Sequence, residues 1–141
     1  MKQVFTVPGT LAGQNEITKS NRTNYNAGAK LKRQEQARVM RAIEQARLEP
    51  FVEPVSGCIL IVCPNMRKDR DNVEGGAKKV ILDALQETGV IKRDSFKLAY
   101  EFPTKCVVGK DPRIVVMVTD EERTVDHIPY WTQLDSDGWM A

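Results

Sequence analysis

The chain has 141 residues, of which 41% are hydrophobic and 28% are charged, and its 21 Lys and Arg against 19 Asp and Glu leave a net charge of +2. This length and composition predict one globular domain and exclude a disordered protein. No apolar run approaches the roughly 18 residues of a membrane span, and the first residues lack a secretory signal pattern, so we expect a soluble intracellular protein with no membrane partner.

Basic and acidic residues are unevenly distributed along the chain. Residues 1–119 contain 20 Lys and Arg against 13 Asp and Glu, a net charge of +7. Residues 120–141 contain one Arg against six acidic residues, a net charge of −5. We therefore expect a basic domain over residues 1–119, which favours a polyanionic partner, and an acidic tail over residues 120–141. Trp131 and Trp139 in this tail either pack it onto the domain or contact a partner.

The first third of the chain predicts a strand, a long loop and a helix. Gln3–Val7 alternates polar and apolar residues and ends at Pro8-Gly9, as a strand does. Residues 10–26 are rich in Asn, Thr and Gly and predict a loop. Residues 27–48 carry an apolar stripe at helical spacing, and the basic residues on the other faces leave open whether this helix faces solvent or phosphate. The loop residues that either contact a phosphate backbone or only make turns are Asn15, Asn21, Arg22, Asn24 and Tyr25.

The rest of the chain predicts a buried strand, a second helix and two further strands. Residues 56–63, SGCILIVC, are apolar almost throughout, which is typical of a strand buried on both faces. After it come a charged stretch over residues 65–74, a helix over about 76–87, a strand over 97–102 that could continue to 108, and a strand over 113–118. The order β-α-β-α-β-β predicts a single α/β (α+β) domain, in which a small mixed sheet packs with two main helices.

The cysteines and the histidine limit the chemistry of the chain. Cys58 and Cys63 share one predicted strand at an odd spacing, so their side chains point to opposite faces and cannot form a disulfide with each other. Together with Cys106 they are expected to be buried free thiols. His127 is the single histidine, which is too little for a zinc site or a Ser-His-Asp triad. A bound metal would therefore take oxygen ligands.

The segment Met66–Asn72, MRKDRDN, places two carboxylates among cations directly after the most buried strand. Asp69 and Asp71 are two residues apart, so in an extended backbone both side chains leave on the same side. They repel each other unless a cation neutralises them, and their oxygens suit Mg²⁺ or Mn²⁺. A structural alternative stays open, in which Asp71 or Asn72 only caps the following helix. The cations that could bind phosphate beside a metal are Arg67, Lys68, Arg70, Lys78 and Lys79.

The longer stretch of residues 66–96, MRKDRDNVEGGAKKVILDALQETGVIKRDSF, resembles the core signature of the RusA family of Holliday-junction resolvases, which are often phage-encoded. In that family a D-x-D-N motif is followed by a lysine-bearing helix ending in L-D-A-L or similar, a Gly-containing turn and another aspartate just before a strand. The N-terminal strand, the loop and the long basic helix also have the family's order. The matching positions are Asp69, Asp71, Asn72, Lys79, residues 82–85, Gly89 and Asp94.

The resemblance implies a Mg²⁺-dependent endodeoxyribonuclease, also supported by Mn²⁺, that resolves Holliday junctions and other branched DNA in recombination and repair. Its nuclease domain would be residues 1–119. It would act as a homodimer, because paired cuts need two sites, in the cytoplasm of a bacterial host. Its metal ligands and catalytic acids would be Asp69, Asp71 and Asp94. Its DNA-binding residues would be Arg67, Lys68, Arg70, Asn72 and Lys78.

Two positions depart from the family's pattern. The catalytic lysine usually follows the second aspartate by four residues, where this chain has Gly75. Alignment on the LDAL helix selects Lys79 instead, with Lys78 as the alternative. Arg93 stands where many relatives have a second acid beside the last aspartate. Glu74 and Asp83 are interpreted as a first-turn acid of the helix and a helix-surface group.

Two functions of other classes stay open. The chain could be a catalytically silent DNA-binding protein that keeps the fold, although three acids in register favour an enzyme. It could also be a phage interaction protein whose acidic cluster only caps a helix. In that case Asp94 would lie far from Asp69 and Asp71.

Overall fold

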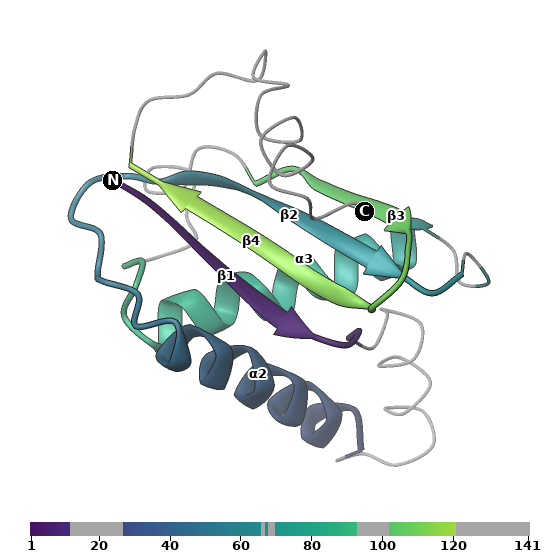
Figure 1. Ribbon diagram of the computed structural model, residues 1–141. Coiled ribbons are helices and arrows are strands. Elements are labelled where there is room, and N and C mark those ends of the chain that lie inside the picture. Colours follow the sequence, from purple (N-terminus) through teal and green to yellow (C-terminus); the bar gives the residue numbers. More distant parts are fainter. Residues whose placement is uncertain (12–26, 66, 68–69, 93–101, 121–141) are drawn as a thin grey trace.

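The computed structural model describes residues 1–11, 27–65, 67, 70–92 and 102–120, without the side chains of Arg70 and Asp71. The described part confirms the predicted α/β fold, a four-stranded mixed sheet with two helices in the order β-α-β-α-β-β (Figure 1). The elements are β1 (Lys2–Pro8), α2 (Ala27–Gln45), β2 (Ser56–Cys63), α3 (Arg70–Glu87), β3 (Thr104–Val108) and β4 (Arg113–Thr119).

The strands lie in the order β1-β4-β2-β3. Because β4 is antiparallel to both β1 and β2, these two strands run in the same direction. β3 is parallel to β2, to which it is joined through α3. The carboxyl ends of β1, β2 and β3 therefore meet at one edge of the sheet, which we call the carboxyl edge. In open α/β sheets, ligands bind outside this edge.

The two helices lie together on one face of the sheet (Figure 1). Beneath them, alternate residues of the strands, such as Phe5, Ile59 and Ile114, form one cluster with the buried sides of both helices. On the opposite face Leu60 and Met117 are also buried, in a second, smaller cluster. β2 is thus buried along its whole length on both faces, as its continuous apolar run predicts.

The boundary of α3 differs from the sequence-based prediction. The helix is expected to begin at about residue 76, after the charged stretch 65–74, yet it begins at Arg70. Two glycines, Gly75 and Gly76, disfavour helix in this stretch when it is considered alone. Val73 and Ala77, however, are both buried in the main cluster. Their burial holds the first turns of α3 against the sheet, so tertiary packing outweighs local propensity here.

The other boundaries agree closely with the predicted elements. β2 matches residues 56–63, β1 and β4 each extend the predicted strands by one or two residues, and α2 ends at Gln45. β3 occupies the predicted continuation of the third strand, while residues 97–101 lie outside the described part, as do the loop 12–26 and the tail 121–141 with their candidate residues. Neither described helix is long and apolar enough to cross a membrane.

Candidate functional site

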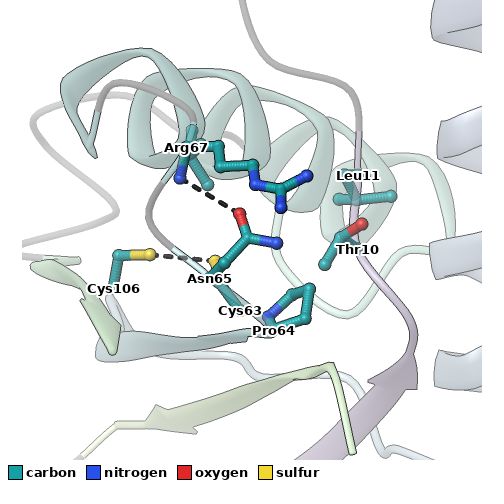
Figure 2. A pocket seen from close by; sticks show the side chains of 8 residues that line it. Thr10, Leu11, Cys63, Pro64, Asn65, Arg67 and Cys106 are labelled. Atoms are coloured by element: carbon teal, nitrogen blue, oxygen red, sulfur yellow. Dashed lines mark hydrogen bonds between the residues drawn. The ribbon is translucent and has the colours of Figure 1, made fainter. Parts of the chain in front are cut away.

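A cavity of about 270 Å³ opens at the carboxyl edge of the sheet (Figure 2). It lies where β1 and β2 end and where the first turns of α3 pass over them. A site at the carboxyl ends of parallel strands is the usual place for a ligand in this class of fold. The residues that line the cavity are Thr10, Leu11, Cys63, Pro64, Asn65, Arg67, Val73 and Cys106.

The chain that leaves β1 is fixed from two sides, which positions Thr10 at the cavity. From α2, the Arg38 guanidinium donates hydrogen bonds to the carbonyl oxygens of Pro8 and Thr10, at 2.6 and 2.9 Å. From the other side, the Gly9 N–H donates to the carbonyl oxygen of Pro112 at 2.8 Å. Gly9 has a φ of +81°, and a Cβ there would approach the Arg38 guanidinium to 3.1 Å. This wall of the cavity is therefore held by well-defined contacts.

A tight turn carries the chain from β2 toward α3. The Asn65 side-chain oxygen accepts a hydrogen bond from the backbone N–H of Arg67 at 3.0 Å, which is the pattern of an Asx turn. Figure 2 shows the Arg67 side chain reaching across Asn65 toward Thr10 and Leu11. One of the predicted DNA-binding cations therefore lines the cavity at the carboxyl edge.

The predicted acidic centre falls only partly within the described residues. Asp69 and Asp94 lie outside them, as does Lys68. Asp71 is the second residue of α3, although its side chain is not described. The extended backbone assumed for Asp71 is thus wrong, because this residue is helical. Its position in the first turn is one where the helix dipole favours a negative charge.

The start of α3 also corrects the capping alternative. An N-cap residue precedes the first helical residue. Since α3 begins at Arg70, both Asp71 and Asn72 lie inside the helix and neither is its N-cap. Asn72 is half-buried. Capping of α3 therefore explains neither Asp71 nor Asn72.

The two candidate lysines of α3 are both exposed. The Lys79 ammonium donates a hydrogen bond to Asp83 at 3.2 Å, one turn further along the helix. The other oxygen of Asp83 lies 3.4 Å from the Lys32 ammonium of α2. Asp83 thus joins the two helices at their surface, which agrees with its interpretation as a helix-surface group. Such exposed ion pairs contribute at most about 1 kcal/mol, so Lys79 can exchange this partner for another at little cost.

Glu74 contacts the sheet instead of the cavity. Its carboxylate accepts a hydrogen bond from the backbone N–H of Cys106 in β3, at 3.0 Å. Among the described strands, β3 has one neighbour, β2. Glu74 therefore binds a backbone donor that no other described strand binds, and its place in the first turns of α3 serves the fold.

The residue types at the start of α3 suit a hard divalent cation. Aspartate carboxylates are the oxygen donors that Mg²⁺ and Mn²⁺ take. Among the described side chains no group of three or more His, Cys, Asp or Glu could hold a metal ion. The side chains of all three predicted ligands lie outside the described part, so only the chemistry of the donor set bears on the metal.

Sequence reasoning missed one pair of residues at the cavity. The Cys63 and Cys106 sulfur atoms lie 3.0 Å apart, within hydrogen-bonding distance for thiols, although 43 residues separate them (Figure 2). The predictions that all three cysteines are buried and free, and that Cys58 and Cys63 lie on opposite faces of the strand, are confirmed. Burial raises the pKa of the Cys58 thiol to about 12. The register of β2 and β3 would have been needed to find the pair.

The sequence matches none of the protein-family models and none of the curated proteins with which we compared it.

Proposed function

We propose that this protein is a Mg²⁺-dependent endodeoxyribonuclease that cleaves branched DNA, with four-way junctions as its main substrate. The observation that carries the proposal is the position of residues 69–72. Residues 70–72 of this D-x-D-N segment begin α3, directly after the short link from the carboxyl end of the buried strand β2. Arg67, within that link, lines the adjacent cavity.

The proposed site combines acids for a metal with cations for phosphate. Asp69, Asp71 and Asp94 would hold Mg²⁺, or Mn²⁺ in its place. A bound metal of this kind polarises a phosphoryl oxygen and lowers the pKa of a coordinated water. The phosphate backbone would be held by the positive end of the α3 dipole and by polar and cationic residues around it. These residues are Arg67, Lys68, Arg70, Asn72 and Lys78.

A lysine of α3 would stabilise the negative charge that develops on the phosphate. The RusA-like motif assigns this role to Lys79. Helix geometry favours its neighbour, because residues seven apart are rotated by only about 20° while residues eight apart are rotated by about 80°. Lys78 therefore shares the helix face of Asp71 more closely, and side chains on a helix tilt toward its N-terminus, where Asp71 lies.

The junction substrate and the homodimer rest on the resemblance to RusA-type resolvases. Resolution needs two symmetric cuts, which two copies of the site supply. The site chemistry supports the coarser part of the proposal, namely a metal and a phosphodiester. Affinity is expected to come mainly from backbone charge and junction shape, and therefore to fall steeply with salt.

The test uses the full chain and a synthetic four-way junction, with linear duplex of the same sequence as the second substrate. Wild-type protein should cut the junction in pairs only when Mg²⁺ or Mn²⁺ is present. Asp71→Asn should lower the cleavage rate at least about 100-fold and leave junction affinity equal or tighter. Glu87→Gln, an equal charge change at the exposed end of α3, should cleave normally.

Three results would separate this proposal from its rivals. Tight junction binding without metal-dependent cleavage by the wild-type protein would support a silent DNA-binding protein instead. If the wild-type protein neither binds nor cleaves the junction, the result would support an interaction protein. Cleavage that survives in Asp71→Asn, with thermal unfolding unchanged, would remove the acidic segment from the site.

A further inference from the structure

Two thiols meet at the floor of the cavity, from neighbouring strands. Cys63 is the last residue of β2, and Cys106 is the central residue of β3. Both lie on the helix-covered face of the sheet and both line the cavity. Their sulfur atoms are 3.0 Å apart. Two residues that are distant in the sequence thus form a vicinal dithiol that a small reagent entering the cavity can reach.

Cys58 provides a contrast within the same strand. It belongs to the cluster on the opposite face, with Leu60, Val115 and Met117. It does not line the cavity, and its high pKa keeps it protonated at neutral pH, which makes it a poor nucleophile. The strand therefore carries one thiol with a thiol neighbour beside a cavity and one thiol that is inert.

We propose that Cys63 and Cys106 form an oxidisable dithiol, which hydrogen peroxide converts to a reversible disulfide between β2 and β3. This inference is independent of the nuclease proposal, because it rests only on the sulfur pair and the cavity.

The reaction proceeds in two steps that balance. Cys63, at 6% exposure the more accessible of the two against 1% for Cys106, attacks a peroxide oxygen as the thiolate. An S–O bond forms, the O–O bond breaks, and hydroxide leaves as water after taking a proton, so that Cys63 becomes a sulfenic acid. The Cys106 sulfur then attacks this sulfur. The S–S bond forms, the S–O bond breaks, and a second water leaves. Two thiols lose two electrons, and one peroxide becomes two waters.

The register of β2 and β3 means that this disulfide can form only if the backbone moves. Cys106 pairs with Ile61, so Cys63 is displaced by two residues along the parallel strands. With a rise of about 3.3 Å per residue and strands about 4.8 Å apart, the two Cα atoms are separated by about 8 Å. Disulfides span about 4.4–6.8 Å between Cα atoms, so the bond requires backbone movement. Cys63 is the last residue of β2, and its movement would carry Pro64 and Asn65 at the cavity with it.

The test counts thiols in the reduced full chain before and after treatment with hydrogen peroxide. The protein is unfolded in guanidinium chloride with N-ethylmaleimide, and its intact mass is measured. We expect three adducts before oxidation, one adduct after it, and three again after dithiothreitol. Peptide mapping should join the peptides of Cys63 and Cys106 and place the remaining adduct on Cys58.

Matched variants and alternative outcomes decide the inference. Cys63→Ser should keep both of its remaining thiols after oxidation, and Cys58→Ala should still form the disulfide and then take up no adduct. The wild-type measurement stands even if a variant fails to fold. Three adducts after peroxide, a disulfide that includes Cys58, a link between two chains, or sulfinic acid on Cys63 without a disulfide would each overturn the proposal.

Discussion

The carboxylate of Glu74 in α3 and the backbone N–H of Cys106 in β3 are joined by a hydrogen bond of 3.0 Å. This contact ties the first turns of α3 to strand β3 of the sheet. It also lies directly beside the sulfur pair, because Cys106 supplies both the donor N–H and one of the two thiols. The acid nearest to the D-x-D-N segment within the described residues thus has a structural partner.

Replacement of Glu74 tests this structural role. Glu74→Ala should lower the free energy of unfolding by about 1–2 kcal/mol, because the Cys106 donor loses a charged acceptor. Glu74→Gln retains an acceptor oxygen and should cost less than half of that. Denaturant unfolding of the two variants checks both values. Equal stability of Glu74→Ala and wild type would mean that water replaces the carboxylate at this edge.

The lysines of α3 give a second prediction, which assumes the nuclease activity. On helix geometry we expect Lys78→Ala to lower the cleavage rate about 100-fold. Lys79→Ala, which only releases Asp83, should change the rate less than threefold. Single-turnover cleavage of a four-way junction by the two variants measures this difference. The opposite result would assign the catalytic role to Lys79, as the motif alignment does.

Arg67 provides a test of DNA contact that does not depend on cleavage. Arg67→Gln should weaken junction binding. It should also reduce the magnitude of the slope of log K against log [salt] by about 0.9, the change for one lost phosphate contact. Arg47→Gln carries the same charge change, just beyond the C-terminal end of α2. α2 contacts the carboxyl end of β1 through Arg38, which lies seven residues before the end of the helix. Arg47 therefore lies well beyond that contact. In binding titrations at several salt concentrations, Arg47→Gln should have the same junction affinity and the same salt dependence as the wild type. Equal effects of both variants would indicate a purely diffuse charge effect.

The sequence predicted the sheet better than the site. Strand β2 was recognisable because its whole length is apolar, a local property. The start of α3 was not, because Val73 and Ala77 fix it through burial against the sheet, which local propensity does not contain. The Glu74–Cys106 contact and the sulfur pair escaped for a related reason. The sulfur pair depends on the register between β2 and β3, and the Glu74–Cys106 contact depends on how α3 packs against β3. Both are set by long-range contacts.

Gly57 gives a prediction about the core of the sheet. A Cβ at this position would lie 2.2 Å from the backbone oxygen of Met117 and 2.6 Å from the Phe102 ring. Gly57→Ala should therefore destabilise the fold by about 3 kcal/mol or more, since a clash with backbone in a packed core forces the strands apart. Replacing the ring as well, in the double variant Gly57→Ala with Phe102→Leu, should not restore stability, because the atom closest to the new Cβ belongs to the backbone of Met117. Thermal unfolding of both variants decides the point, and full rescue by the second change would place the strain in the ring.

Oxidation of the dithiol should also change cleavage, a consequence that combines the two proposals. If the disulfide moves the end of β2, it moves Asn65 and the link that carries Arg67 and leads into the start of α3, where Asp71 lies. We expect wild-type protein, once oxidised, to lose at least tenfold in junction cleavage and to recover it after dithiothreitol. Cys63→Ser should cleave equally before and after peroxide, whereas Cys58→Ala should behave as wild type does. A disulfide that forms without any change in cleavage would show that the end of β2 tolerates the movement, and it would leave the dithiol inference intact while removing its link to catalysis.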